Sequence, residues 1–323
     1  MDRFVFFGGK GGVGKTTVAS AYGVQCARGG QQTLLVSTDP AHSTSDVFDQ
    51  GFDDEPAPVE GYDGLSAMEL DPDAEVERHM REIKQAMSDQ VSPAIVNELD
   101  RQIELAHRTP GAYEAALFDR FIDVMRSSDD YDRVVFDTSP TGGTLRLLAL
   151  PELLESWVDR LRQKRAESVD LFEKAAIGDR EARATLEDDP IVRRLAERAE
   201  TFDFAGRVLS EQATFFLVLN PDDLSIAESQ RAIEDLREAD LSVGGLVVNK
   251  VAPAPGESET GIGATYLRER RRAEQARLDR IHESFDQPVV AVLEQRAGVD
   301  GTDLLADLVA DLALGTAVEP PAT

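Results

Sequence analysis

Short apolar runs, rich in β-branched and aromatic residues, alternate along the chain with longer stretches of helical periodicity. Apolar runs bounded by turn residues are typical of buried strands, and apolar positions three and four residues apart are typical of amphipathic helices. The runs predict strands at 4–7, 33–37, 65–70, 133–137, 214–219, 244–249 and 289–293. The periodic stretches predict helices at 16–28, 73–90, 113–127, 151–163, 191–200, 223–238, 265–284 and 302–313. This alternation predicts an α/β fold whose mostly parallel, doubly wound sheet carries helices on both faces.

Two long helical tracts interrupt the alternation, at about 73–127 and 151–210. Both are rich in charge with scattered apolar residues, and both are longer than a single crossover helix requires. We therefore predict one domain over 1–323, in which the two tracts form an inserted helical subdomain over one end of the sheet. The stretch 253–263, rich in Gly, Pro and Glu, is predicted to be a loop.

The composition is strongly acidic and poor in lysine. The chain has 61 Asp and Glu against 34 Lys and Arg, for a net charge of −27. Only six of the basic residues are lysine: Lys10, Lys15, Lys84, Lys164, Lys174 and Lys250. Because acids are spread along the whole chain, we favour adaptation to a high-salt cytoplasm, where molar salt screens charges over about 3 Å. The alternative is an acidic surface for a basic partner, and either interpretation disfavours nucleic acid as a ligand.

The sequence disfavours a membrane-spanning or secreted protein and a protein with a structural metal site. No apolar run approaches the roughly 20 residues that span a bilayer, and the first predicted strand begins too early to leave room for a signal peptide. We therefore expect a cytoplasmic protein without stable membrane insertion. The single cysteine, Cys26, and four scattered histidines predict no disulfide within the chain and no structural zinc.

A glycine-rich segment between the first strand and the first helix carries the strongest chemical signal. It reads Gly-Lys-Gly-Gly-Val-Gly-Lys-Thr, and a strand, such a loop and a helix are the context of a phosphate-binding P-loop. Its backbone N–H groups can point into an anion site, and the helix N-terminus adds partial positive charge. Lys15 is then placed for the β- and γ-phosphates and Thr16 for Mg²⁺. We predict nucleotide binding by Gly9, Lys10, Gly11, Gly12, Val13, Gly14, Lys15, Thr16 and Thr17.

A second lysine inside the loop, Lys10, is not required by a generic P-loop. Loops of the form KGGxGKT occur in a subclass of P-loop ATPases in which this lysine reaches a nucleotide bound by the partner subunit. Lys10 therefore predicts a catalytic contribution across a nucleotide-bridged homodimer. The alternative is a solvated loop lysine.

Two aspartates follow predicted strands and can serve the phosphates. Asp39, after the second strand, can orient the water that attacks the γ-phosphate, although position alone equally allows a simple Asp-Pro turn. Asp137 closes the fourth apolar strand, where it can hold Mg²⁺ through a water, or else cap the following helix. We predict Thr16, Asp39 and Asp137 on the metal side of the site.

The base of the nucleotide has weaker candidates. Asn249 ends a strand, and its amide offers adenine both a donor and an acceptor. The segment Leu293, Glu294, Gln295 and Arg296 is predicted to be a loop that follows the last strand and covers the base.

Taken together, these segments resemble the ArsA family: arsenite-pump ATPases and the ATPases that deliver tail-anchored membrane proteins. The matching text is GGKGGVGKTT at 8–17, STDPAHS at 37–43, AMELDP at 67–72, FDTSPTGGTLRLLALPE at 136–152, VLNPDDLSIAESQR at 218–231, VVNK at 247–250 and VAVLEQRAG at 290–298. The resemblance implies a magnesium-dependent, homodimeric ATPase. It also implies that Lys10 is the signature lysine, Asp39 and Asp137 are the aspartates of switches I and II, Asp222 and Asn249 contact nucleotide, and 293–296 is the adenine loop.

Three departures from the family pattern limit the inference. Gly143 replaces the usual histidine of switch II, so any relay through that side chain is absent. No cysteine pair lies near 264–267, where many targeting members bind zinc at the dimer interface. The chain has one ATPase half and one cysteine, whereas arsenite-pump ATPases sense the metalloid through cysteine thiolates and usually fuse two halves.

The sequence thus predicts an ATP-switched homodimer with three possible outputs. The favoured one is a targeting ATPase that holds a hydrophobic transmembrane segment in a groove built from the two helical tracts. The first alternative is the energising subunit of an arsenite or anion efflux pump. The second is a regulatory or scaffold ATPase whose dimer switch binds a protein partner.

Overall fold

One eight-stranded sheet forms the centre of the chain. The computed structural model describes residues 2–38, 43–71, 112–137 and 190–295, with isolated positions at 74, 78, 305, 308, 312 and 314. The strands are β1 (Phe4–Gly8), β2 (Thr33–Ser37), β3 (Ala57–Pro58), β4 (Leu65–Glu69), β5 (Arg133–Asp137), β6 (Ala213–Leu219), β7 (Val243–Val251) and β8 (Val289–Glu294). Their order is β3-β4-β2-β5-β1-β6-β7-β8, and every neighbouring pair is parallel except β3 with β4.

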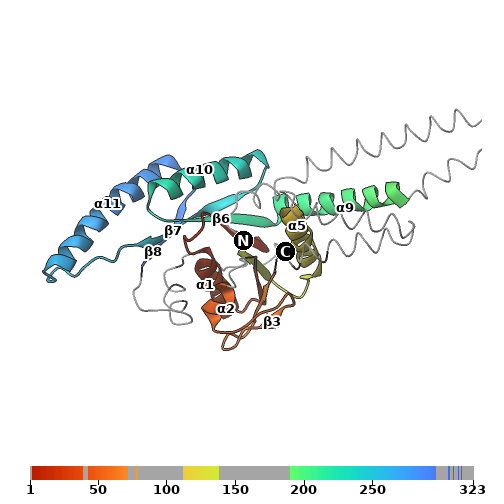
Figure 1. The fold of residues 1–323 in the computed structure, drawn as a ribbon, viewed down its shortest axis with the longest axis horizontal. Coiled ribbons are helices and arrows are strands. Elements are labelled where there is room, and N and C mark those ends of the chain that lie inside the picture. Colours follow the sequence, from red (N-terminus) through yellow and green to blue (C-terminus); the bar gives the residue numbers. More distant parts are fainter. Residues whose placement is uncertain are drawn as a thin grey trace, which may run out of the picture.

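Helices cover both faces of this sheet, as Figure 1 shows. The buried apolar side chains of α1 (Lys15–Arg28) and α2 (Ser43–Phe48) share one core cluster with the isolated C-terminal positions Leu305 and Leu308. The opposite face is covered by α5 (Ala112–Ser127), α9 (Pro190–Glu211), α10 (Asp223–Glu238) and α11 (Ile262–Ser284). The predicted α/β, doubly wound, mostly parallel sheet is therefore confirmed.

Aromatic packing holds the middle of the sheet in register. The ring of Phe6 on β1 stacks against Phe136 on β5 and Phe215 on β6, with centroid distances of 4.5 and 4.7 Å. All three side chains are fully buried, as expected for central parallel strands with helices on both faces. Because parallel strands end together, this register brings the ends of β1, β5 and β6 to one edge of the sheet.

The observed elements follow the predicted ones, with some differences. The helix predicted at 191–200 extends over Pro190–Glu211, and the one predicted at 265–284 begins at Ile262, inside the predicted 253–263 loop. The sequence pattern did not predict α2 and β3, because elements of six and two residues are too short to show a period. The helices predicted at 73–90, 151–163 and 302–313 lie, apart from isolated positions, outside the described residues.

Apart from the isolated positions 74 and 78, the predicted helical subdomain is described only at the C-terminal ends of its two tracts. There, α5 and α9 pack onto the sheet through buried residues including Phe121, Ile122, Phe202 and Leu209. These ends therefore contribute to the main core beside the sheet. The subdomain itself stays a prediction.

Nowhere in the described ranges does a helix combine the length and the apolar character that crossing a bilayer requires. The longest one, α11, has 23 residues and carries six arginines.

Candidate functional site

The glycine-rich loop leaves β1 at the carboxyl edge of the sheet and enters α1 directly. Gly9 has φ 139°, and a Cβ there would lie 2.2 Å from the Val218 carbonyl oxygen on β6. Gly14 caps α1 with φ 91°, and a Cβ there would lie 2.5 Å from the Asn249 amide nitrogen. Both positions therefore demand glycine, because the neighbouring strands β6 and β7 approach the loop closely.

Three carbonyl groups of the loop accept hydrogen bonds from side chains. Lys15 Nζ donates to Lys10 O at 3.1 Å, and Lys250 Nζ donates to Gly12 O at 2.5 Å. Asn249 Nδ2 donates to Val13 O at 2.8 Å. These contacts fix the curled backbone that the sequence predicted.

The first turn of α1 supplies the other predicted phosphate and metal groups. Lys15 is buried, whereas Lys10, Thr16 and Thr17 are half-buried. A buried ammonium at a helix N-terminus is well suited to an anion, since both carry positive charge toward it. The loop thus combines backbone donors, a helix terminus and Lys15 at one point.

Asp137 lies beside this loop, at the end of β5. It is 2% exposed and occupies the register position next to Phe7 on β1 and Ser37 on β2. Ser37 Oγ donates to Asp137 Oδ2 at 3.4 Å, and the Thr38 N–H donates to Asp137 O at 3.1 Å. Asp39 lies outside the described residues, but it directly follows Thr38, so the chain enters that segment next to Asp137.

The donor set near the loop fits a magnesium ion. The Thr16 hydroxyl and the Asp137 carboxylate are hard oxygen donors, and Mg²⁺ commonly takes only one or two such protein ligands, with phosphates and waters completing its shell. Among the described residues no group of three or more His, Cys, Asp and Glu side chains gathers into a metal cage. Magnesium held jointly with phosphates needs no such cage.

A cavity of about 250 Å³ opens beside the loop, where β6, β7 and β8 end. Its walls combine residues that follow β6, residues at the ends of β7 and β8, and residues of α11. They are Asn220, Pro221, Asp222, Lys250, Arg270, Glu274 and Gln295. Two of the predicted nucleotide contacts, Asp222 and Gln295, therefore lie in one cavity next to the phosphate loop.

Asp222 also caps α10. Its carboxylate accepts hydrogen bonds of 2.8 Å from the Ser225 N–H and from the Ser225 hydroxyl. Burial raises the pKa of Asp222, but these hydrogen bonds and the charge of Lys10 outweigh burial, so the pKa is held below its ordinary value. The side chain is thus ionised at neutral pH and carries negative charge near Lys10.

The residues predicted to contact the nucleotide base, Asn249 and 293–296, differ in their surroundings. Asn249 is buried, with its Nδ2 on the loop and its Oδ1 accepting from the Lys250 N–H at 2.8 Å, so its amide braces the backbone. Leu293 and Glu294 belong to β8, which confirms the strand predicted at 289–293 and corrects the expectation of a loop over all of 293–296. Leu293 is fully buried in the core. Gln295 follows the strand, Arg296 lies outside the described residues, and adenine contact by these residues stays a prediction.

Several residues around the site were not among the predicted site residues. Lys250 and Arg270 line the cavity, and Glu274 accepts from both Arg270 Nε and the Ala252 N–H, at 2.8 and 2.7 Å. Glu69, buried at the end of β4, accepts from the Ser45 N–H and hydroxyl, each at 2.9 Å. Of these residues, only Lys250 could have been identified from the sequence, because lysine is so rare in this chain.

Known proteins match nearly the whole chain. A family model described as anion-transporting ATPase, the ArsA ATPases, matches residues 2–314. A Halobacterium salinarum protein named as an arsenical pump-driving ATPase is 34% identical over 308 residues, which cover 95% of this chain but 43% of that protein. The Paramecium tetraurelia ATPase ASNA1 homolog 2 is 34% identical, covering 77% of this chain and 76% of its own length. The Neurospora crassa ATPase get3 is 31% identical, covering 88% and 82%.

Proposed function

The chain belongs to the anion-transporting ATPase family, and we propose that it is a magnesium-dependent P-loop ATPase that works as an ATP-switched homodimer. The observation that carries the proposal is the loop itself. Its carbonyls are held by Lys15, Asn249 and Lys250, and Asp137 lies beside it at the sheet edge. This arrangement leaves backbone N–H groups, the α1 terminus and a carboxylate for a nucleotide phosphate and its metal.

Each protein group has a distinct task in this proposal. The loop N–H groups and Lys15 bind the phosphates, and Thr16 and Asp137 are the residues that would hold the metal. Magnesium, when bound, neutralises charge on the phosphate oxygens. Asp39 positions the attacking water, and Lys10 stabilises charge on the partner's nucleotide as it develops.

The exchange of functional residues across the dimer gives a sharp test. Lys10→Ala should bind ATP but lose most turnover, and Asp39→Asn should bind ATP without hydrolysing it. In a mixed dimer, one site has an intact Asp39 and receives an intact Lys10 from its partner, so activity should return on mixing. Turnover would be measured in molar potassium chloride, with mixed dimers confirmed by two affinity tags.

Two results would refute this dimer mechanism. One is normal turnover by Lys10→Ala, and the other is a mixture that stays inactive although mixed dimers form. Failure of the wild-type chain to bind ATP would instead refute the proposed ATPase function as a whole.

As the client, we propose a hydrophobic transmembrane segment. The support is the resemblance of the motifs to ATPases that deliver tail-anchored proteins, together with the get3 and ASNA1 relatives. The test is to present a purified transmembrane peptide and a charge-interrupted version of it to the chain. ATP-dependent capture of the first alone is expected, and equal capture of both would contradict the proposal.

The second candidate function is to drive an arsenite or anion pump, because the Halobacterium relative is named as an arsenical pump-driving ATPase. The Cys26 thiol gives it no support. That side chain is fully buried on α1, which keeps it from solvent, and burial raises its pKa, which disfavours the thiolate form. Stimulation of ATP turnover by arsenite or antimonite would favour the pump over the targeting role.

A further inference from the structure

Lys250 helps to hold the loop, but the proposed chemistry gives it no task. Its ammonium donates to the Gly12 carbonyl, while the preceding Asn249 amide donates to the Val13 carbonyl. Two successive residues at the end of β7 thus hold two successive peptide groups of the phosphate loop. Neither contact follows from the P-loop motif, which lies more than two hundred residues away in the chain.

Peptide geometry gives these contacts a consequence for the anion site. A peptide group is planar, so its C=O and the following N–H point in opposite directions. A donor that holds Gly12 O on the outside of the loop turns the Val13 N–H inward. In the same way, Asn249 on Val13 O turns the Gly14 N–H inward. A cation on the carbonyl also polarises the peptide group and strengthens its N–H as a donor.

The local backbone is shaped for this contact. Between Val248 and Val251 of β7, the register with β8 slips by one residue, because Val248 pairs with Val292 and Val251 pairs with Glu294. Lys250 lies in this bulge with φ 56°, in the left-handed region that residues with side chains rarely adopt. Bulges re-aim side chains, and rare backbone conformations gather at functional sites.

Composition supports the same conclusion. The chain has only six lysines, and the three that lie in the described residues, Lys10, Lys15 and Lys250, all stand in or on the phosphate loop. In the other described parts of the chain, positive charge is supplied by arginine. A lysine offers a compact ammonium, which suits a single carbonyl better than a planar guanidinium does.

We propose that Lys250 is a positioning residue for the nucleotide phosphates, which orients the loop N–H groups through the Gly12 carbonyl. This inference rests on the proposed nucleotide binding. It predicts that Lys250 serves the polyphosphate and not the base, although the residue also lines the cavity beside the loop.

The test compares Lys250→Met with wild type, and uses Arg272→Met as a control that removes the same charge from an exposed position of α11. Calorimetry in molar potassium chloride would measure the affinities for ATP and for inorganic tripolyphosphate, which has no base. Lys250→Met should weaken both by the same factor, about tenfold or more, as expected for a lost hydrogen bond from a charged donor. The control should leave both unchanged, and Lys250→Arg should recover part of the loss.

Hydrogen exchange without ligand separates positioning from a direct charge effect. Amides in the loop peptide should exchange faster in Lys250→Met than in wild type or the control, although no phosphate is present to feel the charge. If Lys250→Met does not fold, Lys250→Gln replaces it in all measurements. Unchanged tripolyphosphate affinity, weakening of ATP alone, or unchanged loop exchange would each overturn the proposal. Absence of ATP binding by wild type would refute the proposed function instead.

Discussion

The two edges of the central sheet use similar side chains for opposite purposes. Strands β1 and β5 run from one edge to the other, so the comparison involves the same strands. At the carboxyl edge, Lys15, Lys250 and Asn249 hold carbonyls of a loop whose N–H groups face a ligand site. At the amino edge, where the parallel strands begin, arginine side chains donate to backbone carbonyls that do not belong to a ligand-binding loop.

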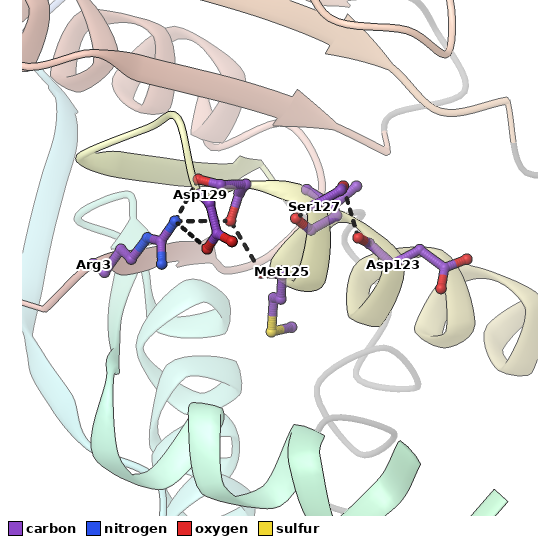
Figure 2. A network of polar contacts seen from close by, with 7 residues as sticks. Arg3, Asp123, Met125, Ser127 and Asp129 are labelled. Atoms are coloured by element: carbon purple, nitrogen blue, oxygen red, sulfur yellow. Dashed lines mark hydrogen bonds and ion pairs between the residues drawn. The ribbon is translucent and has the colours of Figure 1, made fainter. Parts of the chain in front are cut away.

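Figure 2 shows the amino edge around Arg3. The Arg3 guanidinium donates to the Ser128 carbonyl in the turn after α5 and lies 3.6 Å from the Asp129 carboxylate. Ser127 Oγ caps the end of that helix by donating to Asp123 O at 2.8 Å. Deeper in the same edge, Arg133 is 1% exposed and donates to the Asp2 carbonyl, and the Asp2 carboxylate accepts from Thr214 Oγ1.

The difference lies in what separates the bonded groups. At the amino edge, the bonded groups belong to the starts of strands and to the end of a helix. The arginine donors there therefore join these segments to one another and stabilise the fold. At the carboxyl edge a glycine-rich loop intervenes, and holding its carbonyls turns its N–H groups toward the site. We infer that the amino edge serves stability and the carboxyl edge serves ligand binding, and three substitutions test this division.

The largest effect is expected from Lys15→Ala at the carboxyl edge. ATP affinity should fall by at least about a hundredfold, because the phosphates lose a charged donor at a buried position. The melting temperature without nucleotide should change by only a few degrees. ATP binding at wild-type strength would remove Lys15 from the site, and a large loss of stability would show that this edge also holds the fold together.

Arg133→Ala should have the converse effect at the amino edge. We expect a loss of about 3 kcal/mol in the free energy of unfolding, because a large buried side chain and its hydrogen bond to Asp2 disappear together. Denaturant unfolding measures this loss, and the folded fraction should bind ATP as wild type does. Arg3→Ala, which removes a more exposed guanidinium, is the matched variant and should cost about 1 kcal/mol. Equal effects of the two variants would contradict the role assigned to burial.

The smallest effect is expected from Asp222→Ala, which lies at the carboxyl edge but caps a helix. Losing the acceptor for the Ser225 N–H should cost about 1 kcal/mol of stability at pH 7, and Asp222→Asn, which keeps an acceptor, should lose less. Because the folded pKa of Asp222 is lowered, its stabilisation is present above the unfolded value of about 3.9 and disappears as the pH falls through the folded pKa. Unfolding measured from pH 7 downward should therefore show wild type and Asp222→Ala converging in acid. A constant difference across this range would contradict ionic capping.

The sequence predicted the carboxyl edge much better than the amino edge. The loop at 9–16 and the carboxylate at Asp137 were recognisable because phosphate chemistry demands fixed residue types at fixed spacing. Arg3 and Arg133 gave no signal, because each donates to a backbone carbonyl, which any residue supplies, and the Asp129 carboxylate near Arg3 comes from a distant part of the chain. For the same reason, the sequence predicted that Asn249 meets a base but not that its amide meets the Val13 carbonyl.

The amino-acid sequence by itself determined the alternation of strands and helices, the phosphate loop and the family, since these depend on local periodicity and on motifs of adjacent residues. Only the tertiary structure decided that β7 ends in a bulge and that Lys250 and Asn249 reach the loop. These features depend on strand order and register, which place β6 beside β1, and β7 and β8 beyond β6, from distant parts of the chain. Contacts between segments so far apart leave no period and no spacing in the sequence, because they arise only when the whole sheet has assembled.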